Sequence, residues 1–186
     1  MGLRGRRQDR REERQEDRQE FGRGGSAVRY QMRQKLVSIG DDFWIETDQG
    51  ERAFKVNGKA LRVRSTLGFE DPQGNEVARI QERPVRIRES MEVERPDGST
   101  LATIKKAMIT PLRERYSIAT GDGTELEAQG NLVDHEYEIS KGRDKVAEVS
   151  KKWFRVRDTY GVEIEPGQDV IAILTATVAI DMMSHD

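Results

Sequence analysis

The chain of 186 residues contains no cysteine, and this absence excludes several kinds of site. Disulfide cross-links, thiolate nucleophiles and thiolate metal ligands all require that side chain. A single core can still be stable without them, because a domain of about 160 residues buries roughly 70% of the surface of its unfolded chain. Since cysteine-free chains suit a reducing compartment, we expect a soluble cytoplasmic protein.

Histidine is nearly as scarce, with two residues in the whole chain. His185 is next to last, and we expect His135 to be a surface residue of a strand, without a second histidine to complete a metal site. No Gly-x-Ser-x-Gly or glycine-rich phosphate-binding motif occurs. We therefore expect a protein that is not an enzyme and that uses no cofactor, metal ion or catalytic residue.

Neither sign of charge dominates, because 32 Lys and Arg residues face 34 Asp and Glu residues and the net charge is -2. This balance excludes a globally basic nucleic-acid-binding protein. Apolar stretches are also missing near the start, so we expect no secretory signal. The longest apolar run, residues 170–180, would span about 16 Å as a helix against about 30 Å of hydrocarbon, which argues against a transmembrane span.

Residues 1–26 differ in composition from the rest and form a low-complexity tail rich in Arg and Glu. The tail has almost no large apolar side chains and cannot bury a core, so we expect it to be solvated, disordered or loosely helical. A single domain is then expected over residues 27–186. The alternative for the tail is an arm that binds a nucleic acid or a protein partner, although its acidic residues nearly cancel its positive charge.

Five turn sequences divide the middle of the chain into short segments; each contains glycine, and four of them also contain Asp. Asp and Gly supply the positive φ angles and local hydrogen bonds of tight hairpins, so each sequence predicts a chain reversal. The five turns are Asp48-Gln49-Gly50, Asp71-Pro72-Gln73-Gly74, Pro96-Asp97-Gly98, Gly121-Asp122-Gly123 and Lys141-Gly142-Arg143.

The segments between the turns alternate apolar and charged residues, as in Glu136, Tyr137, Glu138 and Ile139. The stretches 61–64 and 85–88 alternate in the same way. This period of two predicts antiparallel strands with one buried and one wet face. A closed sheet would protect the strand edges, but its interior has to be filled.

The run 170–180 is apolar on every side and supplies that filling. Pro166, Gly167 and Asp169 before it are helix-start and capping signals, and Asp181 closes it. Its length and its alanines favour a buried helix, while its Val, Ile and Thr residues leave a buried strand as the alternative.

Three stretches together resemble the LURP-one-related family. They are residues 30–35 (Tyr30 to Lys35), 150–161 (Ser150 to Gly161, including Lys151, Lys152, Trp153 and Phe154) and 167–181 (Gly167 to Asp181). That family is related to the Tubby C-terminal-like group and the phospholipid scramblases. The resemblance, over about residues 28–183, implies a mainly β fold: a closed antiparallel barrel of about twelve strands around a central hydrophobic C-terminal α-helix. It brings no catalytic residues, and fold alone does not give function.

Basic side chains are the remaining candidate for a binding site. Arginines alternate along two predicted strands and a lysine pair follows later, and Tubby-like domains bind phosphoinositide headgroups through basic residues. The alternative is that these charges, with nearby acids such as Glu82 and Glu89, only keep a strand surface soluble. The candidate ligand-binding residues, chosen by charge alone, are Arg62, Arg64, Arg86, Arg88, Lys105 and Lys106, with Arg113 and Arg115 as possible additions.

These observations favour a binding or scaffold module that recognises anionic phospholipid or phosphoinositide headgroups while peripheral to the cytoplasmic membrane surface. A scramblase-like membrane-associated protein is one alternative, and capture of an unknown protein or nucleic-acid partner by the Arg-rich arm is another.

Overall fold

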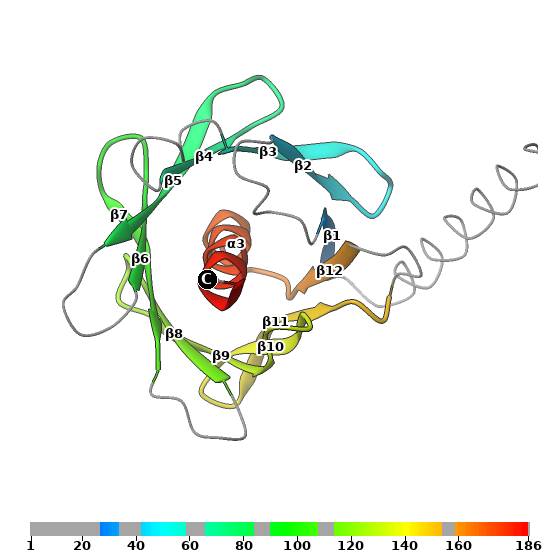
Figure 1. Ribbon diagram of the computed structural model, residues 1–186, viewed down its shortest axis with the longest axis vertical. Coiled ribbons are helices and arrows are strands. Elements are labelled where there is room, and N and C mark those ends of the chain that lie inside the picture. Colours follow the sequence, from blue (N-terminus) through cyan, green and yellow to red (C-terminus); the bar gives the residue numbers. More distant parts are fainter. Residues whose placement is uncertain are drawn as a thin grey trace, which may run out of the picture.

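The computed structural model describes residues 27–33, 42–58, 66–83, 90–107, 114–153 and 159–185. In these residues twelve strands surround one helix (Figure 1). The strands are β1 (Val28–Arg33), β2 (Phe43–Thr47), β3 (Arg52–Asn57), β4 (Thr66–Glu70), β5 (Glu76–Arg83), β6 (Ser90–Glu94), β7 (Thr100–Lys106), β8 (Glu114–Thr120), β9 (Glu125–Asn131), β10 (Glu136–Lys141), β11 (Asp144–Ser150) and β12 (Thr159–Ile164), and the helix is α3 (Val170–His185). The predicted fold class is confirmed.

The sheet is an antiparallel meander that closes on itself. Each strand from β2 to β12 pairs with its neighbours in sequence, and β1 fills the gap between β2 and β12. All six residues of β1 pair with β12, and Arg29 lies directly opposite Glu163. Closure removes the exposed edges of an open sheet.

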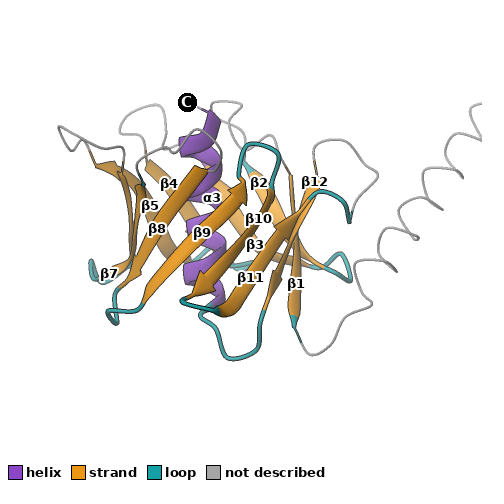
Figure 2. Ribbon diagram, turned by 90° about the horizontal axis from the view of Figure 1, so that it is seen from below, coloured by secondary structure: helices purple, strands orange, loops and turns teal. Residues whose placement is uncertain are grey.

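The five predicted turns are confirmed, and all join strands at one end of the barrel (Figure 2). Gly50, Gly74, Gly98, Gly123 and Gly142 have φ angles between 61° and 87°, which favour glycine. The Asp before the glycine fixes several of these turns; Asp97, for example, accepts a 2.9 Å hydrogen bond from the backbone N–H of Ser99. Glycine at positive φ and hydrogen bonds to nearby Asp side chains therefore determine the turns at this end of the barrel.

Helix α3 runs through the barrel from the turns toward the opposite end (Figure 2). Asp169 caps it by accepting a 3.0 Å hydrogen bond from the N–H of Ala172. The buried hydroxyls of Thr175 and Thr177 return hydrogen bonds of 2.6 and 2.9 Å to the carbonyls of Ile171 and Ile173. These two hydroxyls thus bond backbone carbonyls of the same helix, and the central helix is confirmed.

The helix is longer than the apolar run, because α3 continues beyond Asp181 to His185. Asp181 is buried among apolar residues and not at a solvent-exposed terminus. A carboxylate usually ends an apolar run because burial of its charge is costly. Here a partner outside the helix, described below, accommodates it.

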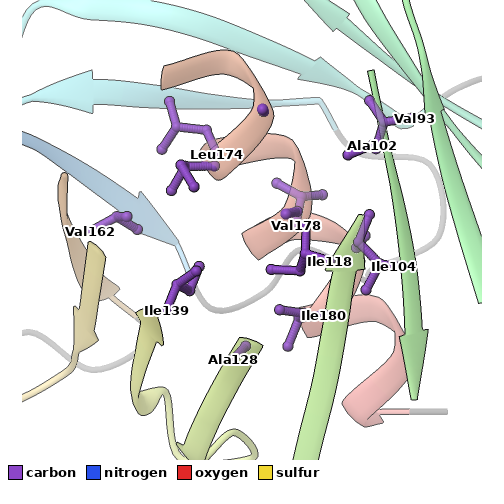
Figure 3. Close-up of a cluster of buried hydrophobic side chains, with 14 of the residues drawn as sticks. Val93, Ala102, Ile104, Ile118, Ala128, Ile139, Val162, Leu174, Val178 and Ile180 are labelled. Carbon is purple, nitrogen blue, oxygen red and sulfur yellow. The ribbon is translucent and has the colours of Figure 1, made fainter. Parts of the chain in front are cut away.

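The helix lies off the centre of the barrel, nearest to β5, β6, β7, β8 and β12. Many interior residues of β6, β7 and β8 are aliphatic, such as Val93, Ala102, Ile104 and Ile118 (Figure 3). On the side of β1–β4, Phe54 contacts both Tyr30 and Phe69, with ring centroids 6.3 and 5.1 Å apart. These rings fill part of the interior between the helix and the first strands.

Among the described residues, no helix combines the length and the apolar character that a membrane passage requires.

Candidate functional site

The two ends of the barrel are built differently. We call the end formed by the segments 47–51, 71–75, 95–99, 121–124, 141–144 and 165–169 the turn rim. We call the opposite end, where α3 terminates, the helix-end rim (Figure 2). The last residues of β1, β3, β5, β7, β9 and β11 lie there, because every second strand of the meander runs in the same direction.

The turn rim is acidic, since its six segments contain eight Asp and Glu residues and three Lys and Arg residues. Several of these acids are held in the charged form. The pKa of Asp71 is lowered by hydrogen bonds from the side chain and backbone of Asn75, and hydrogen bonds from Ser99 lower the pKa of Asp97. A surface of this kind repels anionic ligands.

Lys105 and Lys106 end β7 at the helix-end rim but lie on different faces of the sheet. Lys105 is exposed on the outer face, where Ser90 and Ser117 are its neighbours on the adjacent strands. Lys106 pairs with the buried Tyr116 and is half-buried on the inner side of the rim. The structure therefore places these two candidates close together in the chain but not on one surface.

Four other candidates, Arg62, Arg64, Arg86 and Arg88, lie outside the described residues, as does Arg113. Arg62 and Arg64 fall between β3 and β4 in sequence, and Arg86 and Arg88 fall between β5 and β6. The strand ends that flank both stretches lie at the helix-end rim, as Lys105 does.

Cations on the described outer wall are paired with carboxylates in several places. Lys55 Nζ lies 2.9 Å from Asp42, Arg79 contacts Glu76 at 2.7 Å, and Arg115 contacts Glu127 at 3.4 Å. These pairs fit the alternative reading of the sequence, in which the charged side chains only keep the strand surface soluble. Arg115 in particular forms part of such a pair, and we do not keep it among the candidates.

Glu136 organises a corner of the helix-end rim beside the end of β11. Its carboxylate accepts hydrogen bonds of 3.0 and 3.1 Å from the N–H groups of Lys151 and Lys152, and one of 3.0 Å from the Ser150 hydroxyl. Burial opposes the charged form, but hydrogen bonds from Lys152 and Ser150 dominate and lower the pKa of Glu136. This anchor fixes the turn that carries the half-buried Trp153; Phe154 lies outside the described residues.

His135 is the residue that sequence reasoning placed wrongly. It was expected on a strand surface, yet its side chain is 1% exposed and it belongs to the β9–β10 turn. Leu132 and His135 point inward from this turn while Val133, 44% exposed, faces solvent. A backbone φ of 54° reverses the chain at His135 and breaks the strand alternation on which the expectation relied.

The imidazole of His135 meets the helix inside the barrel. Its Nε2 contacts Asp181 Oδ1, and its ring stacks on Tyr160 with centroids 4.2 Å apart. Burial raises the pKa values of Tyr137 and Tyr160, and the nearby Asp181 carboxylate raises them further. Only the spacing of 46 residues connects His135 to Asp181 in sequence, and no local pattern signals such a contact.

Within the described ranges, no group of three or more His, Asp or Glu side chains is arranged to hold a metal ion.

Comparisons with known proteins match most of the chain. A sequence model of the LURP-one-related family matches residues 28–181. The uncharacterized protein YxjI of Bacillus subtilis (strain 168) is 25% identical over 155 residues, which cover 83% of this chain and 93% of that protein. The X-ray structure of an Arabidopsis thaliana protein superposes with a TM-score of 0.63 over 84% of this chain and 91% of the other, at 17% identity.

Proposed function

The chain belongs to the LURP-one-related family, and from this membership and the charge distribution along its barrel we propose a binding module for anionic phospholipid headgroups. The barrel supplies a rigid support, and binding requires no catalysis. The sequence resemblance links this family to Tubby-like domains, which bind phosphoinositide headgroups through basic residues. This relationship supports recognition of anionic headgroups.

The observation that carries the proposal is the different charge of the two rims. The sequence segments 59–65, 84–89 and 108–113, whose flanking strands end at the helix-end rim, contain six Lys and Arg residues and one acidic residue. Lys105 and Lys106 lie at the same rim, whereas the turn rim carries an excess of acids. A protein of net charge -2 can bind an anionic surface if its charges are separated in this way.

The charge separation also predicts how the barrel is oriented on the membrane surface. The helix-end rim would face the membrane and the acidic turn rim would point into solution. Each Lys or Arg near an anionic bilayer contributes about 1 kcal/mol, so removal of two should weaken binding roughly 30-fold. The attraction acts over about 8 Å at physiological salt and falls as salt rises.

Vesicle flotation tests the proposal. The full chain is mixed with phosphatidylcholine vesicles, with or without phosphatidylinositol bisphosphate, at low and moderate salt. We expect salt-sensitive binding to the charged vesicles only. Arg86→Glu with Arg88→Glu should abolish most of it, while the matched control at the turn rim, Lys141→Glu with Arg143→Glu, should leave it unchanged. Equal binding by both double variants would overturn the proposal.

Deletion of residues 1–26 distinguishes the barrel from the arm. Binding that survives the deletion would assign recognition to the barrel. Binding that disappears would assign it to the Arg-rich tail and would contradict a rim site.

A scramblase-like role for α3 finds no support in its position. The helix is buried from Ala172 to Met183 within the barrel. Its withdrawal into a bilayer would empty the core and expose the interior faces of the strands to water, which is a large loss of apolar burial.

A further inference from the structure

The apolar surface of α3 does not by itself determine how the helix is rotated about its axis or how far it is shifted along the barrel. Its side chains are apolar on every side, and all are buried from Ala172 to Met183. Hydrophobic burial is non-directional, so a rotation or an axial shift of such a helix would exchange one aliphatic surface for another. Apolar burial by itself therefore permits several seatings, by which we mean rotational and axial positions of α3 in the barrel.

Asp181 is the exception. It is the one carboxylate in α3 and lies in its buried part, where it contacts His135 of the β9–β10 turn. A shift by one residue turns the helix by about 100° and moves it about 1.5 Å along its axis. Either change would separate Asp181 from His135 and leave a carboxylate against aliphatic side chains, which is strongly unfavourable.

His135 is held firmly enough to act as a fixed reference. Its N–H donates a 3.2 Å hydrogen bond to the Leu132 carbonyl, and Asn131 and Asp134 join the ends of the same turn through a 2.7 Å side-chain hydrogen bond. The imidazole rests on the Tyr160 ring of β12. The left-handed backbone at His135 persists because these contacts hold it there.

A second polar contact agrees with the same seating. Tyr116 Oη of β8 lies 3.3 Å from Ser184 Oγ, one turn beyond Asp181. The β9–β10 turn and β8 thus contact two polar residues, Asp181 and Ser184, at the end of the helix, and the Tyr137 side chain of β10 bonds Thr177 one turn earlier. The buried Thr175 hydroxyl instead bonds carbonyls of the helix itself.

We propose that His135 and Asp181 form a register clasp, a conformational device that selects one rotational and axial setting of α3 among the seatings that apolar packing allows. Buried polar pairs fix register in this way in coiled coils at some cost in stability. The clasp does not depend on the proposed lipid function.

The test replaces the clasp by apolar residues in the full chain, as His135→Phe with Asp181→Leu. Methyl-labelled methionine reports the seating, because Met182 and Met183 lie on α3 and Met32 and Met91 lie on β1 and β6. We expect one methyl signal for each helix methionine in the parent chain. In the apolar pair we expect a folded protein with several or broadened signals for Met182 and Met183.

Two further variants sharpen the result. Thr175→Val, which removes a buried hydroxyl that bonds carbonyls of the helix itself, should keep single signals. The exchange His135→Asp with Asp181→His should restore single signals, since Asp also tolerates a positive φ. Single sharp signals in the apolar pair, or heterogeneity in the exchanged pair equal to that of the apolar pair, would overturn the clasp. An unfolded apolar pair would do so too, because the two residues would then stabilise the fold instead of selecting its register.

Discussion

At the level of single residues, the ionisable groups inside the barrel set its response to alkali. The pKa values of Tyr137 and Tyr160 are raised by burial and by Asp181, so both stay protonated in the folded chain at a pH where the unfolded chain loses these protons. The unfolded state then binds fewer protons, and stability falls as pH rises.

We therefore expect the free energy of unfolding to be unaffected by these groups below about pH 10 and to fall above it, by up to about 1.4 kcal/mol per pH unit for each tyrosine. Urea titrations between pH 8 and 11 would measure the slope. Tyr137→Phe should reduce it. A slope unchanged by that substitution would show that other groups cause the alkaline loss.

The environments of individual residues were only partly predictable. Lys105 was a candidate by its charge alone, and the structure shows it exposed on the outer face of β7. The burial of His135 could not be predicted, because strand alternation applies only until the chain turns, and the turn there contains no Asp-Gly signal. Glu136 was recognised only as a wet strand residue; its role as an acceptor for the Ser150–Lys152 turn depends on the register between β10 and β11.

At the level of elements, helix α3 is the part of the core most sensitive to charge. Val178 is fully buried. Val178→Asp should therefore unfold the domain, because an unpaired buried charge costs several kcal/mol against a typical stability of about 5 to 15. Circular dichroism and thermal melting would report the loss.

The matched control is Val133→Asp, the same substitution at an exposed valine of the β9–β10 turn. It should change stability by less than about 0.5 kcal/mol. If the two variants melt alike, the helix is not central to the core.

The elements themselves were largely predictable, because each depends on local chemistry. Glycine at positive φ marks the tight turns, and an all-round apolar run with Asp169 before it marks the helix. The sequence did not show how Asp181 is accommodated inside the helix, because its partner His135 comes from a distant turn. The predicted strands at 61–64 and 85–88 lie outside the described residues.

At the level of the whole molecule, the barrel depends on the seam between β1 and β12. Arg29 Nε contacts Glu163 Oε2 at 2.7 Å across this seam, with side-chain exposures of 6% and 20%. Loss of the guanidinium would leave the carboxylate poorly solvated. Arg29→Met should therefore lower the free energy of unfolding by about 2 kcal/mol, measured by chemical denaturation.

Arg79→Met provides the comparison, since Arg79 and Glu76 form a pair of the same 2.7 Å length with exposures of 47% and 34%. This surface pair should contribute less than about 1 kcal/mol. Equal effects of the two substitutions would mean that the seam pair does not stabilise closure.

The acidic turn rim also exists only at this level. Composition shows a nearly neutral chain, and the six segments of the turn rim are separated from one another along the sequence. Only the meander brings these six segments together, because every second connection returns the chain to the same end of the barrel.

The order of the elements has a consequence for biosynthesis. The strand that closes the barrel and the helix that fills it follow the other eleven strands in the chain. A ribosome therefore releases a curved sheet whose apolar face has no cover until residues 159–185 emerge. A nascent chain that stalls before residue 159 is therefore expected to be prone to aggregation.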